Sequence, residues 1–410
     1  MCGNSSAGRS STTSTAERVR ILHVTHNFPR WPGDRAGAFV ARIAALAAAR
    51  GADVRALAPH AAGATVDDVV GGVPVTRFRY APDGLERIGY QGDVRRSLAA
   101  PVAALTLPVY LTAFRHAVRR AVRDFRPDLI HAHWWVPGGW AAAGQGPPVV
   151  ISCHGSDVRL LLRSAALRIL ARRTFARVDR ITAVSALMRA DLAAVVPALE
   201  ARLTTAYLPV EVDRFTLPPA RTDAVPRILY AGNLIAAKGV DLILRAYARL
   251  RSAGVACTLR IVGGGVERQA LAALADALGV GPLVEWGGTR APADMPAEYA
   301  AATVTVMASR GPRGEGLPMT IVEALLAGSA VVATPAGGTI EVVQDGETGL
   351  LARDGDAIDL ARQLGRMLGD PALRHATAAA GKAFCLRAFA PGPAMDRFFG
   401  VYEAALAGRR

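Results

Sequence analysis

The chain has 410 residues, of which 51% are hydrophobic; this length predicts two domains, and the composition is far from that of a disordered chain. Its formal net charge of +14 would suit a nucleic-acid partner, but the sequence contains no known nucleic-acid module and no interleaving of lysines with aromatic residues, so none is expected. Four cysteines without a CxxC pair (Cys2, Cys153, Cys257 and Cys385) fit neither a disulfide framework nor a zinc site and indicate a reducing compartment.

The first half of the chain alternates short apolar runs with longer helical stretches. Residues 1–16 are rich in Ser, Thr and Gly and lack the apolar core of a signal peptide, so a disordered tail is expected. The alternation that follows is typical of parallel βαβ units. We predict a Pro- and Gly-rich loop after the first strand, a helix at 38–51, and strands at 18–26, 53–59, 72–80, 127–135, 148–155 and 178–185.

The longest uncharged run, at 98–114, contains Pro101 and Pro108. It is therefore predicted to be a buried helical segment rather than a membrane span. We expect a cytoplasmic protein that is soluble or attached peripherally to the inner face of the cell membrane.

A Pro-rich polar stretch at 213–226 is predicted to be a linker. A second alternating series follows it, with strands predicted at 227–233, 257–265, 283–288, 304–309 and 330–334 and two final amphipathic helices at about 356–384 and 388–408. The sequence thus predicts two doubly wound α/β domains in tandem. Ligands in such sheets bind beyond the carboxyl ends of the strands, so two facing edges would form an interdomain cleft.

The positive charge is concentrated in the first half. Residues 1–215 hold 28 arginines and 16 acidic residues, a balance of +12, whereas residues 216–410 hold 20 basic and 18 acidic residues, a balance of +2. The arginine-rich helices could be ordinary solvated faces. An anionic membrane surface or a phosphorylated substrate would also fit a basic first domain.

Two acids in the second half indicate a ligand. Glu315 lies in a Gly/Pro loop, and Glu323 lies inside the apolar helix that opens after Pro318. The first N–H groups of such a helix suit a diphosphate, and Lys238, after another strand, could neutralise it. A carboxylate at Glu323 could accept hydrogen bonds from a ribose diol, and Glu315 could accept from the hydroxyls of a sugar. One nucleoside diphosphate (NDP) sugar would account for all these groups.

The motifs around these residues resemble the retaining glycosyltransferases of family 4. The matching segments are "HGSD", "AVS", "GNLxxxKG" and "EGLPxxxxEAxxAGxxVVATxxGGxxE", which contains the E-x7-E pair, and the match covers nearly everything after about Val19. The resemblance implies a GT-B fold of two facing Rossmann-like domains: an acceptor-binding domain at 17–215, an NDP-sugar-binding domain at 216–385, and a C-terminal helix at 386–410 that crosses back. It also implies transfer of a hexosyl group, with retention, to a hydroxyl of a saccharide acceptor, which in this family is often lipid-linked and serves cell-envelope or polysaccharide biosynthesis.

The resemblance also assigns roles to individual residues. Glu323 would bind the ribose diol and Glu315 the donor hexose, while the N–H groups of Met319 and Thr320 would hold phosphate oxygens and Lys238 would pair with the diphosphate. Of these, Glu315 and Lys238 are expected to be catalytic.

Further positions complete the expected site. His154 of "HGSD" would lie against the transferred sugar as a catalytic residue, and Gly37, Gly316 and Arg290 would contact the donor, Arg290 near its base. Asn233 stands where many members have arginine. The candidates to replace that charge are Arg35, Arg310 and Arg313.

No metal and no cofactor are expected, because no residues here have metal-ligand spacing. His131 and His133 are interpreted as packing residues or as a wall for the acceptor. Two other functions stay open: a sugar-nucleotide epimerase of the same fold, which should carry more acid/base side chains in the cleft, and a non-catalytic basic binding protein, which would leave the donor-site loops unexplained. Neither the donor base, nor the hexose, nor the acceptor follows from the sequence.

Overall fold

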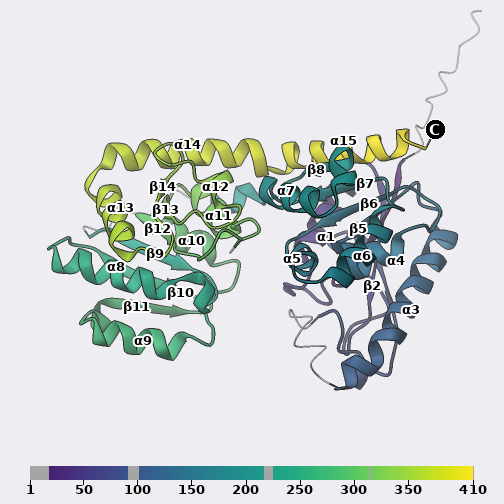
Figure 1. The fold of residues 1–410 in the computed structure, drawn as a ribbon, viewed down its shortest axis with the longest axis horizontal. Helices are drawn as coiled ribbons and strands as arrows, with labels where there is room; N and C mark the ends of the chain where they lie inside the picture. The colour runs from purple at the N-terminus through teal and green to yellow at the C-terminus, as the bar shows by residue number, and fades with distance from the viewer. Residues whose placement is uncertain (1–17, 91–100, 217–224, 314, 410) are drawn as a thin grey trace, which may run out of the picture.

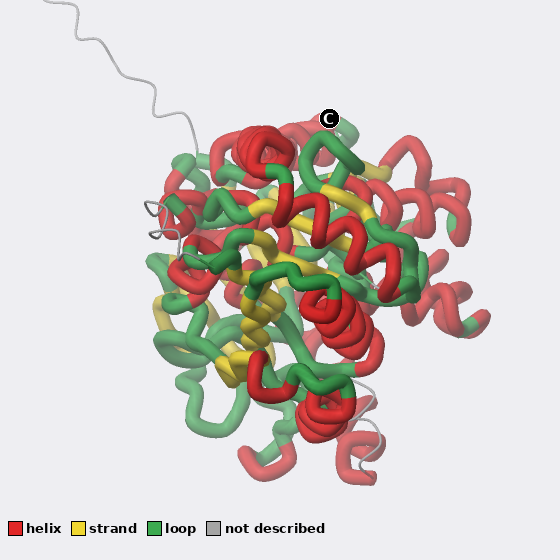
Figure 2. Tube along the Cα trace, turned by 90° about the vertical axis from the view of Figure 1, so that its left-hand side faces the viewer, coloured by secondary structure: helices red, strands yellow, loops and turns green. Residues whose placement is uncertain are grey.

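The structure is a computed structural model that describes residues 18–90, 101–216, 225–313 and 315–409. The expected N-terminal tail and the middle of the expected linker lie outside these ranges. Two α/β domains lie side by side along the longest axis, each with strands inside and helices outside (Figures 1 and 2). This is the predicted fold class.

The first domain is built on a sheet of eight strands within the described residues, ordered β3-β4-β2-β1-β5-β6-β7-β8. All neighbours pair in parallel except β3 and β4, which are antiparallel. The strands are β1 (Arg20–Val24), β2 (Asp53–Pro59), β3 (Asp67–Val70), β4 (Val73–Phe78), β5 (Leu129–His133), β6 (Val149–Cys153), β7 (Arg180–Ala183) and β8 (Leu203–Thr205).

Helices cover both faces of this sheet, so its central strands are buried on both sides; β6 is an almost continuous apolar run, whereas β5 carries two buried histidines. The helices are α1 (Ala38–Ala49), α3 (Pro101–Phe125), α4 (Trp140–Ala142), α5 (Ser156–Arg163), α6 (Ala165–Phe175) and α7 (Ala186–Val195), with short turns η1 (Asp83–Leu85), η2 (Trp134–Gly139), η3 (Pro197–Arg202) and η4 (Val212–Phe215). Helix α3 covers much of the long uncharged run. None of the described helices is both long and apolar enough to span a membrane.

The second domain has a parallel sheet of six described strands, ordered β11-β10-β9-β12-β13-β14. They are β9 (Arg227–Ala231), β10 (Thr258–Val262), β11 (Val284–Gly288), β12 (Val304–Met307), β13 (Ala330–Ala333) and β14 (Leu350–Leu351). Its helical segments are η5 (Ala236–Lys238), α8 (Val240–Ser252), α9 (Arg268–Ala277), η6 (Gly281–Leu283), α10 (Met295–Ala300), α11 (Met319–Leu326), α12 (Thr339–Val342) and α13 (Ala357–Gly369).

Two C-terminal helices join the domains. Helix α14 (Pro371–Phe389) packs on the second domain, and α15 (Pro391–Ala407) packs on the first, so the pair runs along one edge of both (Figure 1). In α15, the Tyr402 hydroxyl lies 2.8 Å from His131 Nδ1 in the first sheet. The chain crosses between the domains at Ala390, four residues beyond the start of the expected C-terminal helix.

Several short elements differ from the sequence expectations. Strands β3, β8 and β14 were not predicted because they have two to four residues, too few to show a period. The helix expected at 356–384 is two helices, since the Asp370 side chain caps α14 and Pro371 occupies its first turn. The three described cysteines, Cys153, Cys257 and Cys385, are buried free thiols.

Candidate functional site

The expected site residues follow strands at or beside the point where the strand order of each sheet reverses. In the first sheet, β1 lies between β2 and β5; in the second, β9 lies between β10 and β12. Gly37 and His154 lie in segments after β1 and β6, while Lys238 and Glu315 lie after β9 and β12. Such reversals are where doubly wound sheets bind ligands.

Helix α11 supplies an anion-binding end and a buried carboxylate. No side chain caps the helix, and the backbone N–H groups of Met319 and Thr320 have no partner within the described chain. Glu323 Oε2 accepts a hydrogen bond from the Tyr299 hydroxyl at 3.0 Å. Burial raises the pKa of Glu323, although the bond from Tyr299 and the charges of Arg214 and Arg42 oppose the shift.

Glu315 is paired with Lys238. The ammonium group of Lys238 and the Ser309 hydroxyl both donate to Glu315 Oε1, and only 10% of the Glu315 side chain is exposed. A Cβ on Gly337 would approach the Glu315 carbonyl to 1.8 Å, and φ at Gly337 is +57°, so this position requires glycine. The Glu315 loop is thereby held against the turn after β13.

The candidate replacements for the charge missing at Asn233 are mostly engaged elsewhere. Arg310 pairs with Asp241 at 2.6 Å, and Arg313 pairs with Asp191 at 2.7 Å. Arg35 is exposed, makes no ion pair among the described residues, and donates a hydrogen bond to the Arg290 carbonyl at 2.8 Å. Of the three, Arg35 is the one whose charge is not neutralised by an acid.

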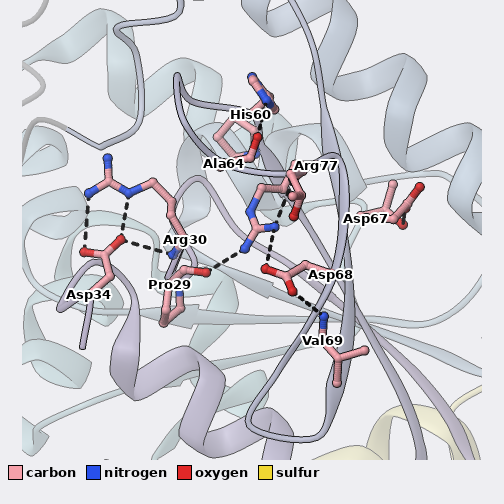
Figure 3. A network of polar contacts seen from close by, with 12 residues as sticks. Pro29, Arg30, Asp34, His60, Ala64, Asp67, Asp68, Val69 and Arg77 are labelled. Atoms are coloured by element: carbon pink, nitrogen blue, oxygen red, sulfur yellow. Dashed lines mark hydrogen bonds and ion pairs between the residues drawn. The ribbon is translucent and has the colours of Figure 1, made fainter. Parts of the chain in front are cut away.

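The loop that carries Gly37 is anchored along its length (Figure 3). Asp34 accepts from the backbone and side chain of Arg30 and from the Ala36 N–H. Burial alone would raise the pKa of Asp34, but the hydrogen bonds from Arg30 and Ala36 lower it overall. The buried guanidinium of Arg77 donates to the Pro29 carbonyl at 2.7 Å. At the end of the loop, a Cβ on Gly37 would lie 2.4 Å from the Asn27 carbonyl oxygen.

His154 lies at the end of β6 among aromatic rings. The ring centroids of Phe39 and Trp134 lie 4.7 and 4.6 Å from that of His154. The Asp157 carboxylate accepts hydrogen bonds from the backbone N–H groups of His154 and Gly155, both at 3.0 Å, which fixes this turn. Burial lowers the pKa of His154 to about 3, so the ring is neutral near pH 7.

Helix α7 of the first domain is bound by the second domain at two points. The Glu341 carboxylate accepts from the N–H groups of Ala186 and Leu187 at 2.8 and 3.0 Å and from the Tyr207 hydroxyl at 3.1 Å. Further along α7, Asp191 receives the Arg313 guanidinium. We call these two contacts the α7 clasp.

The α7 clasp brings the two sets of loops together. A pocket between the domains is lined by Gly155, Arg159 and Met188 from the first domain and by Arg313, Glu315 and Gly316 from the second. A Cβ on Gly316 would lie 3.9 Å from the His154 carbonyl oxygen. His154 and the Glu315 loop therefore face each other across one cleft.

Other expected residues lie at the edges of this arrangement. Asn233 is exposed, and its carbonyl accepts from the Tyr230 hydroxyl. Arg290 is exposed and pairs with Glu298 at 3.3 Å.

Sequence reasoning missed three features of the site. His23 had no motif around it, and Glu341 was noted only as the last letter of a motif. The third is the presence of side chains that lie close enough in space to hold a metal ion, which their spacing along the sequence did not indicate. The described residues contain two groups whose ligand atoms lie within 4.8 Å of one another: His23, His131 and His133, and His60, Asp83 and Glu86.

Comparison with known proteins identifies the chain. A family described as "Glycosyl transferases group 1" matches residues 218–384, and "Glycosyltransferase Family 4" matches residues 36–214. The D-inositol 3-phosphate glycosyltransferase of Acidothermus cellulolyticus is 31% identical over 97% of this chain and 92% of its own length. The chain belongs to the family 4 glycosyltransferases.

Solved structures agree on the fold of this glycosyltransferase. Sucrose-phosphate synthase from Thermosynechococcus elongatus matches with a TM-score of 0.74 at 21% identity, covering 95% of this chain and all of its own. Anabaena Alr3699/HepE in complex with UDP and glucose matches with a TM-score of 0.71 at 19% identity, over 94% of this chain and all of its own. The predicted GT-B architecture is confirmed, and the protein is a glycosyltransferase; transfer from an NDP-sugar to a saccharide acceptor fits this family.

Proposed function

We propose that this glycosyltransferase moves a hexosyl group from an NDP-sugar to an acceptor hydroxyl with retention of anomeric configuration, using the cleft between its domains. The observation that carries the proposal is the Lys238–Glu315 pair, which follows two neighbouring strands of the second sheet and faces His154 across the cleft. The uncapped end of α11 lies in the same loop region. Together these groups offer a cation, N–H donors and sugar-binding acceptors to one ligand.

Each group has a distinct role in the proposed reaction. The N–H groups of Met319 and Thr320 bind the diphosphate, and Lys238 shifts from Glu315 toward it as charge develops on the leaving group. Glu315 then accepts from donor hydroxyls and Glu323 from the ribose. The β-phosphate oxygen takes the proton of the acceptor hydroxyl, which attacks the face from which the diphosphate departs. Closure of the cleft excludes water, which would otherwise hydrolyse the donor.

The acceptor is proposed to be an anionic or lipid-linked saccharide bound by the first domain. Two observations support this: the curated relatives are named for an inositol phosphate, and positive charge is concentrated in residues 1–215. Burial lowers the pKa of Arg115, and the nearby charges of Arg119 and Arg177 lower it further, so basic groups of α3 and of the segment after α6 form a common surface. Such a surface would attract the anionic headgroups of a membrane, where lipid-linked saccharides reside.

A donor panel tests the proposal. The purified protein is incubated with UDP-, GDP- and ADP-hexoses, each without acceptor, and slow release of nucleoside diphosphate identifies the donor. Acceptors are then added, and NMR of the product reports the configuration of the new bond. An inverted linkage would refute retention, and a donor interconverted without release of nucleoside diphosphate would indicate an epimerase.

A further inference from the structure

Three buried histidines form a hydrogen-bonded chain that ends at the site. His23 Nδ1 lies 3.1 Å from His133 Nε2, and His133 Nδ1 lies 3.2 Å from His154 Nε2. Successive rings are nearly parallel, at 16° and 17°. This chain of three histidines runs from β1 through β5 to the end of β6, so it connects the middle of the first sheet with the cleft.

The hydrogens in this chain can be arranged in only two ways. All three rings are neutral near pH 7, because burial lowers the pKa of His23 and of His154 to about 3 and lowers that of His133 as well. Each neutral ring has one N–H and one acceptor nitrogen, and each contact needs one hydrogen. The three rings must therefore point the same way, leaving His154 Nδ1 either protonated or bare.

The two ends of the chain favour one arrangement. His23 Nε2 at the inner end and His154 Nδ1 at the outer end are buried without a hydrogen-bond partner among the described residues. An orphaned buried N–H is rarer in proteins than an under-satisfied acceptor. His23 is fully buried inside the sheet, whereas His154 is only partly buried and follows β6, with its carbonyl oxygen near Gly316 of the second domain. The favoured arrangement leaves His23 Nε2 bare and places the hydrogen on His154 Nδ1.

We propose that His133, supported by His23, is a positioning residue that holds His154 as its Nδ1–H tautomer, so that His154 offers a hydrogen-bond donor to an oxygen of the donor sugar. The inference rests on the proposed function, in which His154 lies against that sugar. Without His133, His154 would be free to adopt either tautomer, and part of the population would present a bare nitrogen where a donor is needed.

The same region could instead be considered as a metal site, since His23, His131 and His133 offer ligand atoms within 4.8 Å. Hydrogen bonding explains the geometry better. Both nitrogens of His131 are already engaged, by Ser152 Oγ at 2.7 Å and by the Tyr402 hydroxyl at 2.8 Å. The group also contains no carboxylate to offset the charge of a buried dication.

NMR of the full-length protein labelled with ¹⁵N-histidine tests the tautomer directly. The variant His133→Asn retains an amide N–H near the position of the ring Nδ1–H. The variant His133→Phe fills the space but has no hydrogen-bonding group. His131→Phe is the matched control, because His131 is equally buried on the same strand but is not one of the three hydrogen-bonded histidines. We expect His154 to be protonated at Nδ1 in the wild type, His133→Asn and His131→Phe, and to show a mixture of tautomers in His133→Phe.

Kinetics with the identified donor supply a second readout. Loss of one hydrogen bond in the transition state predicts that kcat falls about tenfold in His133→Phe, with a much smaller fall in His133→Asn and His131→Phe. The inference is overturned if wild-type His154 is protonated at Nε2, if His133→Phe leaves the tautomer unchanged, or if one equivalent of Zn²⁺ shifts the rings of His23, His131 and His133 together. A protein with the expected tautomer but no activity on any NDP-sugar would instead refute the proposed function.

Discussion

The Glu341 carboxylate of the second domain caps the first turn of α7 in the first domain, accepting the Leu187 N–H at 3.0 Å. A helix N-terminus carries partial positive charge, so a carboxylate there is favourable. This contact adds to the closed position of the two domains an acidic side chain that lies outside the expected donor-binding residues.

Replacing Glu341 with Ala should loosen the α7 clasp. Loss of a helix cap costs about 1 kcal/mol, and the Tyr207 hydroxyl also loses its acceptor. We expect small-angle X-ray scattering to show a larger radius of gyration for Glu341→Ala and kinetics to show a higher KM for the donor. Glu347→Ala, an exposed acid a few residues further along, is the control and should match the wild type. An unchanged radius would mean that other contacts suffice to close the cleft.

Glu323→Ala should weaken donor binding by about 1.5–3 kcal/mol, the range for hydrogen bonds to a charged group. Isothermal titration calorimetry with the identified donor measures the change. Glu403→Ala, at an exposed position of α15, serves as the control for a lost acid. Equal affinity of the Glu323 and Glu403 variants would remove Glu323 from the donor site.

The carboxylate of Glu323 is expected to strengthen donor binding, but its raised pKa predicts that its charge destabilises the free protein at neutral pH. The folded state holds the Glu323 proton more tightly than the unfolded state, so stability is lost as pH rises through the folded-state pKa. Glu323→Gln removes that charge and still accepts from Tyr299. Thermal melting should therefore give a higher Tm for Glu323→Gln than for the wild type at neutral pH, with the difference disappearing at acidic pH. A lower Tm at neutral pH would contradict the assigned shift.

Transfer is expected to continue in EDTA. Lys238 and the N–H groups of α11 supply the positive charge that a metal ion would otherwise bring to the diphosphate. Turnover should be similar after chelation and after addition of Mg²⁺ or Mn²⁺. Abolition by EDTA with rescue by either ion would show that these groups are insufficient.

The basic surface of the first domain should bind anionic vesicles at low salt. Such attraction is screened over about 10 Å at 0.1 M salt, so binding should fall as salt rises. The double variant Arg119→Ser/Arg177→Ser, which removes two exposed arginines of this surface, should reduce vesicle co-sedimentation without changing turnover on a soluble acceptor. Arg245→Ser/Arg249→Ser removes two exposed arginines from α8 of the second domain and is the matched control. If the wild-type protein ignores anionic vesicles, a soluble acceptor becomes the better hypothesis.

Strands and helices that are long enough to show a periodic pattern of hydrophobic residues could be predicted from the sequence. Contacts between loops that are distant in the sequence could not. The order of strands and helices around β1 and β9 follows from alternating apolar runs. The pairing of Lys238 with Glu315 was not predicted as an ion pair, because each residue was assigned to a ligand and the pair spans 77 positions.

The histidine chain shows the same limit. His131 and His133 are two residues apart on β5, which predicts that both lie on the same face of the strand, and a packing or acceptor-wall role was favoured for them. The contact of His133 with His23 depends on the parallel register that places His23 beside His131. Register between strands 110 positions apart does not follow from local patterns.

The C-terminal crossing at Ala390 has a mechanical consequence. The Val210 N–H, near the end of the first domain, donates to the Phe389 carbonyl at 2.9 Å, so the outgoing and returning segments lie against each other. Two bodies joined by two adjacent segments can rotate about the line through both, while sliding or twisting would strain one of them. We therefore expect the cleft to open mainly by rotation about this line, so that each closure would return His154 and the Glu315 loop to the same alignment.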